Sequence, residues 1–195
     1  MRSSRLIPIF FIAFSFFTFS IQAKADEYAV YVFNDVGWDR AQVDKATEEA
    51  KSIYQNACGV NVQPSTVRYL NIPNEYISLD EEEQLGLINQ LKKGPEKISV
   101  FFIADSTDAF QAYAYLPETP DDSRNTIWLT RNIDGRCLAR TLAHELGHLL
   151  LNEANHRSEK SNLMHSTCVA SNYARAASGT SLDSKQCEIL TSGLR

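Results

Sequence analysis

The sequence predicts an α/β fold, with a twisted mixed sheet of about five strands, helices packed on it, and an antiparallel strand at one edge. Segments with the apolar pattern of strands alternate with segments whose apolar residues recur at helical spacing. Residues 97–104 form the most apolar segment after the N-terminal run, and they are short and rich in β-branched side chains. That combination is typical of a buried central strand.

The first half of the domain is expected to alternate strands with helices. Residues 27–36 are rich in β-branched and aromatic side chains, which favours a strand. Residues 38–57 place their apolar side chains mostly on one side of a helix, which ends at Gly59. Residues 66–72 predict a second strand. Residues 78–93 predict a helix that begins with the capping residue Ser78 and has acidic residues, among them Asp80, Glu81 and Glu82, near its positive end.

The second half is expected to carry an edge strand and the main functional helix. Residues 111–116 alternate with period two and stop at a proline, which indicates an edge strand, and residues 125–131 predict the last strand. A helix follows Asp134 as N-cap, with leucines at helical spacing. Residues 182–191, capped by Ser181, predict a final helix.

The first 25 residues have the features of a signal peptide. A basic start precedes the apolar run 6–21, and Ala23 and Ala25 supply the small-residue pattern at which signal peptidase cuts. The run is short for a bilayer span. We therefore expect export to a secreted or periplasmic location, no stable membrane insertion after cleavage, and one domain over residues 26–195.

The charge of the expected domain disfavours nucleic acid and anionic membranes as partners. Three of the 19 basic residues lie in the first 25 positions, so 16 remain against 24 acidic residues, a formal net charge of −8. We expect a monomer. The neighbouring pair Asp121 and Asp122 is expected in a plain surface turn rather than in a calcium site.

The four cysteines predict two disulfides, because an exported chain meets an oxidising compartment. They are scattered and form no C-x-x-C pair, which argues against a zinc site made of cysteines. Three pairings are open to four cysteines. We favour Cys168 with Cys187 and Cys58 with Cys137.

The strongest functional signal is the position of the histidines, because all four lie between residues 144 and 165. His144 and His148 stand one turn apart on the predicted helix, so their imidazoles can bind the same Zn²⁺ ion. Glu145, beside the first histidine, is expected to act as general base on a metal-activated water and then to protonate the leaving amine. This is the chemistry of peptide hydrolysis.

These residues resemble the metzincin clan of zinc peptidases, of matrixin-like or reprolysin-like type, whose pattern is H-E-x-x-H-x-x-G-x-x-H followed by a methionine turn. The clan's glycine and third histidine would fall at Leu151 and Ala154. We therefore expect His156, two residues later in the chain, to replace the clan's third histidine as ligand. Asn152 is expected to end the helix in the left-handed conformation that the clan's glycine adopts. Glu153 is the rival third ligand.

The resemblance implies a zincin-like α+β domain with an active-site helix, a methionine turn and a C-terminal helix. Met164, in Ser-Asn-Leu-Met-His, matches the methionine that packs beneath the ligands, and His165 is expected beside the site or on the surface rather than as a ligand. In this clan an edge strand pairs with extended substrate. The matching residues here are Ala112, Tyr113, Ala114 and Tyr115.

The sequence thus predicts a secreted zinc-dependent endopeptidase that acts on a protein or peptide. Two alternatives stay open. One is a noncatalytic, zinc-stabilised extracellular binding module, in which protein ligands fill every coordination position. The other is a zinc amidase that acts on cell-wall peptides, because the metal chemistry is shared.

Overall fold

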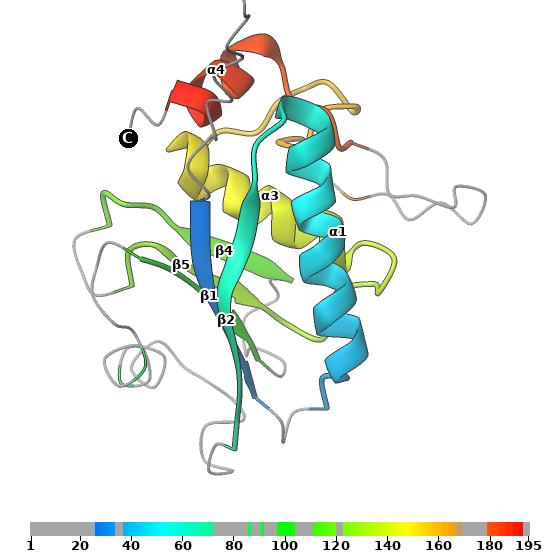
Figure 1. Ribbon diagram of the computed structural model, residues 1–195, viewed down its shortest axis with the longest axis vertical. Helices are drawn as coiled ribbons and strands as arrows, with labels where there is room; N and C mark the ends of the chain where they lie inside the picture. Colours follow the sequence, from blue (N-terminus) through cyan, green and yellow to red (C-terminus); the bar gives the residue numbers. More distant parts are fainter. Residues whose placement is uncertain are drawn as a thin grey trace, which may run out of the picture.

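A five-stranded mixed sheet forms the centre of the molecule (Figure 1). The computed structural model describes residues 26–33, 37–71, 86, 91, 97–103, 111–119, 123–166, 168 and 179–192. In spatial order the strands are β2 (Val62–Leu70), β1 (Asp26–Phe33), β3 (Ile98–Phe102), β5 (Thr126–Leu129) and β4 (Ala112–Tyr115). Strand β4 pairs antiparallel with β5, and the other neighbours are parallel. The predicted fold class is confirmed.

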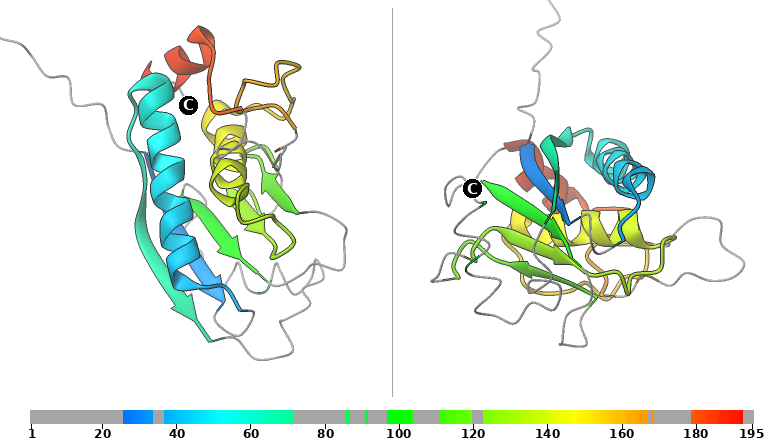
Figure 2. Two further views of the ribbon diagram at one scale, coloured as in Figure 1. Left: turned by 90° about the vertical axis from the view of Figure 1, so that its right-hand side faces the viewer. Right: turned by 90° about the horizontal axis from the view of Figure 1, so that it is seen from below.

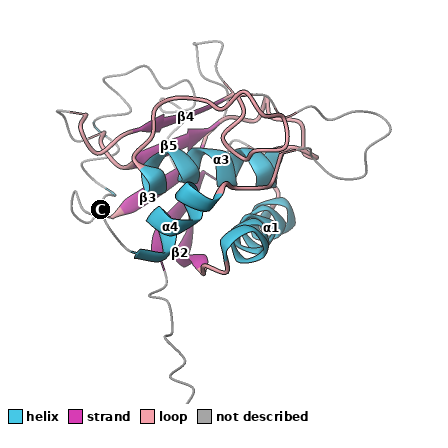
Figure 3. Ribbon diagram, turned by 90° about the horizontal axis from the view of Figure 1, so that it is seen from above, coloured by secondary structure: helices cyan, strands magenta, loops and turns pink. Residues whose placement is uncertain are grey.

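Two helices cover one face of the sheet, and a third packs against both. Helices α1 (Arg40–Cys58) and α3 (Leu138–Leu151) lie on the same side of the strands (Figure 2). Helix α4 (Ser184–Ser192) packs against α1 and α3 (Figure 3). Of the helix expected over residues 78–93, only Gly86 and Leu91 are described, and both are helical.

Strand β3 is buried along its whole length, as the apolar segment 97–104 predicts. Its neighbours β1 and β5 place aromatic side chains in register with it on the face away from α1 and α3. Phe101 stacks between Tyr31 and Trp128, with ring centroids 5.1 Å and 4.5 Å apart. Aromatic pairs of this kind contribute about 0.5–1.5 kcal/mol each beyond the area they bury. They hold the central strands in the register that positions the edge strand β4.

Three element boundaries differ from the sequence expectation. Strand β2 begins at Val62 rather than at residue 66, because an edge strand tolerates Pro64 and the pairing with β1 shifts register there. Asp134 does not cap α3: its carboxylate binds Arg136, and the helix begins at Leu138, four residues later. Helix α4 is capped by Asp183, whose Oδ1 accepts from the amide of Gln186 at 2.8 Å.

The expected disulfide pairing is wrong. The structure pairs Cys58 with Cys187 and Cys137 with Cys168, with Cα atoms 5.1 Å and 5.9 Å apart. The reason is tertiary packing, because α4 packs against α1, whose last residue is Cys58. Cys137 lies immediately before α3. It pairs with Cys168, which follows the segment around Leu163 and Met164 that packs against that helix.

The expected signal peptide, residues 1–25, lies outside the described residues, and so do Asp121 and Asp122. None of the described helices combines the length and the apolar composition that crossing a bilayer requires.

Candidate active site

Three histidine side chains meet beside α3. His144 and His148 lie one turn apart within the helix, and His156 reaches them from the loop that follows it. One ring nitrogen from each histidine lies within 4.8 Å of those of the other two, and the Nε2 atoms of His144 and His148 are 3.1 Å apart. Within the part of the chain that the structure describes, no other histidine, cysteine or carboxylate joins this group, and His165 is outside it.

The end of α3 explains why His156 reaches this position. Asn152 adopts the left-handed conformation, with φ 49° and ψ 48°, and its amide donates to the carbonyls of His148 and Leu149. The amide of Glu153 also donates to the His148 carbonyl, at 3.0 Å. These bonds turn the chain back along the helix immediately after its last residue. Asn152 therefore plays the helix-ending role that the sequence predicted for it.

The two helical histidines present the same nitrogen to the cluster. His144 Nδ1 lies 2.7 Å from the Leu163 carbonyl, and His148 Nδ1 lies 2.5 Å from the Glu153 carbonyl. A carbonyl oxygen only accepts, so we assign the proton of each ring to Nδ1. Both Nε2 lone pairs then face each other at 3.1 Å, an arrangement that a shared cation stabilises. The donor set therefore fits a divalent metal such as Zn²⁺.

Burial sets the charge state of the groups at this site. It lowers the pKa of His144 to about 3 and also lowers the pKa of His148, so both rings are neutral at pH 7, the form that binds metal. Burial raises the pKa of Glu145 to about 7, and the positive charge of Arg140 opposes that rise. Glu145 is thus a buried carboxyl beside two neutral imidazoles.

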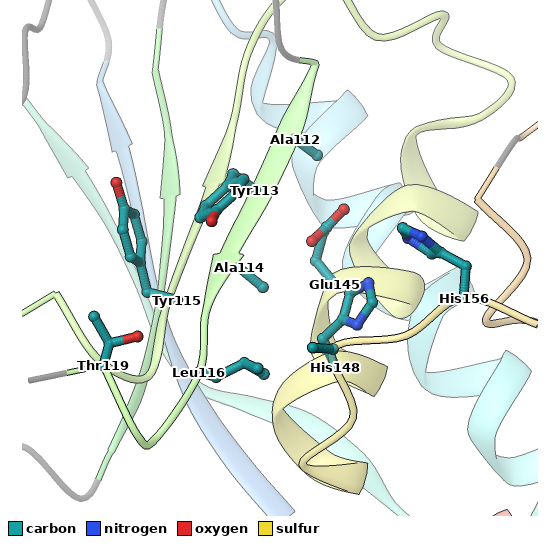
Figure 4. A pocket seen from close by; sticks show the side chains of 10 residues that line it. Ala112, Tyr113, Ala114, Tyr115, Leu116, Thr119, Glu145, His148 and His156 are labelled. Atoms are coloured by element: carbon teal, nitrogen blue, oxygen red, sulfur yellow. The ribbon is translucent and has the colours of Figure 1, made fainter.

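A cavity of about 280 Å³ separates the histidines from the edge strand β4. Glu145, His148 and His156 line one wall (Figure 4). The other wall is formed by the strand and the loop after it, through Ala112, Tyr113, Ala114, Tyr115, Leu116 and Thr119. Figure 4 shows the side chains of Ala112 and Ala114 directed toward α3 and those of Tyr113 and Tyr115 directed away from it. Small side chains therefore face the three histidines across the cavity.

The side chain of Met164 packs against α3. It is fully buried, and its Sδ lies 2.5 Å from the position that a Cβ on Gly147 would occupy. Its amide donates to the Asn162 side chain at 2.8 Å, and its carbonyl accepts from the Arg157 amide at 2.8 Å. Only a glycine at position 147 allows the thioether to approach the helix so closely.

Two findings concern residues around the cluster. Glu153, the rival third ligand, pairs with Arg157 at 3.1 Å rather than joining the three histidines. Sequence reasoning missed Arg140, which is buried near the site. A signal was present in the sequence, because Arg140 is a charged residue one turn before His144 on the same face of the helix.

Comparison with known proteins identifies the fold. No family model and no curated protein matches the sequence. Metalloproteinase-II from Bacteroides fragilis is 16% identical with a TM-score of 0.59, over 87% of this chain and 53% of that one. The archaemetzincin of Archaeoglobus fulgidus, solved with malonate, is 11% identical with a TM-score of 0.53, over 84% and 99% of the two chains. That of Methanopyrus kandleri is 12% identical with a TM-score of 0.53, over 86% and 94%.

The chain has the fold of these proteins. It spans about half the length of the Bacteroides enzyme and nearly the full length of the two archaemetzincins. At such low identities the likeness concerns the fold, so the chemistry has to be argued from the side chains of this protein.

Proposed function

We propose that the protein is a zinc-dependent endopeptidase that hydrolyses proteins or peptides outside the cytoplasm. The observation that carries this proposal is the convergence of His144, His148 and His156 beside the buried Glu145, in a cavity that an edge strand borders. Imidazole ligands bring no negative charge, so a Zn²⁺ ion held by these three side chains would keep its full charge, lower the pKa of water and polarise a carbonyl group.

Glu145 is the group that moves protons. Its carboxylate accepts a proton from the attacking water and returns it to the nitrogen of the leaving amine. Its place on the helix, next to His144, brings it into the cavity where the scissile bond would lie.

Strand β4 is suited to bind an extended substrate. Among the described strands it is the last in the sheet order, with β5 as its neighbour, so an extended segment could add to the sheet along Ala112–Tyr115. The inward Ala112 and Ala114 leave room for substrate side chains between the strand and α3. We propose that a substrate segment lies along β4 with its scissile carbonyl near Glu145. A cavity that follows a strand edge supports cleavage within a chain.

The three-histidine cluster argues against the noncatalytic alternative. A structural zinc site fills all four positions with protein ligands, and among the described residues this cluster has three members. Two disulfides and the expected signal peptide support action in an oxidising compartment. The matrixin-like or reprolysin-like subtype, the monomeric state and the ligand role of each histidine stay predictions.

The decisive test replaces Glu145 with glutamine. Purified protein lacking residues 1–25 is incubated with a mixed peptide library, with and without a zinc chelator, and cleavage is read by mass spectrometry. We expect Glu145→Gln to lower the cleavage rate about 10²- to 10⁴-fold while zinc stays bound, and chelation to abolish cleavage. Glu188→Gln, on the exposed surface of α4, is the matched control and should cleave as the parent does.

Equal cleavage by Glu145→Gln and the parent would overturn the catalytic role. If the parent cleaves cell-wall peptides but no member of the library, the amidase reading replaces the endopeptidase one.

A further inference from the structure

Arg140 is a buried cation whose hydrogen bonds go to backbone carbonyls. It is 3% exposed. Its Nε donates to the Gly179 carbonyl at 3.2 Å, and its Nη2 donates to the carbonyls of Leu163 and His165 at 2.9 Å and 2.5 Å. No described carboxylate forms an ion pair with it. Burying a guanidinium without a carboxylate partner is costly, and the three hydrogen bonds to carbonyl oxygens offset part of that cost.

The Leu163 carbonyl connects Arg140 to the histidine cluster. The same oxygen that accepts from Arg140 Nη2 also accepts from His144 Nδ1, at 2.7 Å. The two donors belong to one face of α3, because residues 140 and 144 are one turn apart. The carbonyl is therefore held between the helix's own cation and the imidazole that it orients.

The Glu153 carbonyl, which orients His148, differs from the Leu163 carbonyl in how it is held in place. It accepts from His148 Nδ1 at 2.5 Å, but it receives no arginine donor among the described residues. Its position follows from the turn at Asn152 next to it in the chain. Leu163 is nineteen residues from His144 along the chain, so its carbonyl needs an independent support.

We propose that Arg140 is a positioning residue, which fixes the Leu163 carbonyl so that His144 keeps its proton on Nδ1 and presents Nε2 to the metal. The inference rests on the metal site of the proposed function. The guanidinium is suited to this task because its planar donors reach three carbonyls at once, on both sides of Met164 and at Gly179. A lysine offers a single ammonium and matches this geometry only in part.

The test compares Arg140→Met, which keeps most of the side-chain volume and removes the donors, with Val62→Ala. Val62 is buried in β2, the strand farthest from β4, so its variant destabilises the core without touching the cluster. Zinc affinity is measured by competition with a chelating dye, and stability by urea unfolding of the metal-free proteins. We expect Arg140→Met to bind zinc about 10- to 100-fold more weakly, and Val62→Ala to bind it as the parent does.

A second measurement reads His144 directly. Long-range ¹H–¹⁵N spectra of the metal-free parent should show His144 as the Nδ1–H tautomer. Arg140→Met should show a mixture of tautomers, and Arg140→Lys should fall between it and the parent. If Arg140→Met does not fold, Arg140→Lys decides: unchanged affinity and an unchanged tautomer overturn the inference.

The failure of the inference is distinguishable from that of the proposed function. A parent that binds no zinc overturns the metal site itself. A parent that binds zinc, together with an Arg140→Met protein of equal affinity and the same tautomer, overturns only the role of Arg140. An equal loss of affinity in Val62→Ala would also overturn that role, because general destabilisation would then explain it.

Discussion

The cluster is built from two unlike regions, a helix that supplies two histidines and a loop that supplies the third. His144 and His148 are buried, and each Nδ1 lies within hydrogen-bond distance of a carbonyl. His156 is exposed and comes from the loop after Asn152. The helix fixes the spacing of its pair through backbone geometry, whereas the loop must be held by individual turn bonds. The helical pair should therefore dominate metal affinity.

The largest expected effect is the loss of a helical ligand. In His148→Ala the imidazole that the Glu153 carbonyl orients is gone, and the two remaining rings no longer share a rigid frame. We expect zinc affinity to fall by more than about 100-fold, beyond the loss that removing an orienting partner causes. Dye competition measures it, and circular dichroism of the metal-free variant confirms that α3 is still formed. A smaller loss than in His156→Ala would reverse the comparison.

The loop ligand comes next. His156→Ala should weaken zinc binding by about 10- to 100-fold, because the exposed ring is less rigidly held than the helical pair. Glu153→Gln is the informative partner, because its carboxylate is engaged with Arg157 at 3.1 Å and should contribute little. We expect that variant to stay within about twofold of the parent. The opposite ranking of the two variants would make Glu153 the third ligand.

Features set by local spacing could be predicted from the sequence. The central strand followed from the continuous apolar run before Ala104, and the helical pair from the four-residue spacing of His144 and His148. The helix end followed from the tolerance of asparagine for a left-handed conformation at position 152. Each depends on a few neighbouring residues, so the chain itself carries the information.

Features set by contacts between distant segments could not be predicted. The disulfide partner of Cys58 depends on how α4 packs against α1, which no local pattern encodes. Asp134 is a residue type that is common at N-caps, but its carboxylate accepts a hydrogen bond from Arg136 instead of capping the helix. The role of Arg140 depends on the return of Leu163 to the helix. The sequence of residues 144–148 therefore predicts a metal site, whereas the contacts from distant segments that hold its side chains in place could be found only in the structure.

A third prediction concerns the contact between the helix and Met164. A Cβ at Gly147 would lie 2.5 Å from Met164 Sδ, so Gly147→Ala forces the thioether or the helix to move. We expect a destabilisation of about 1–3 kcal/mol by urea unfolding, typical of an overpacked core. The double variant Gly147→Ala, Met164→Ala tests the cause, because the shorter side chain removes the clash. The cost of the glycine substitution should then largely disappear, and a cost that persists would place the strain in the helix backbone.

The smallest expected effect concerns the left-handed backbone conformation of Asn152, at the start of the loop after α3. Asn152 has φ 49°, so Asn152→Ala keeps a Cβ in a conformation that costs about 1–2 kcal/mol, whereas Asn152→Gly does not. Both variants lose the hydrogen bond from the Asn152 amide group to Glu118, at 2.7 Å, so the difference between them reports the backbone alone. We expect Asn152→Gly to be the more stable of the two by about 1 kcal/mol in urea unfolding. Equal stabilities would mean that the turn after α3 is held by the following loop rather than by this residue, and the path to His156 would then need another explanation.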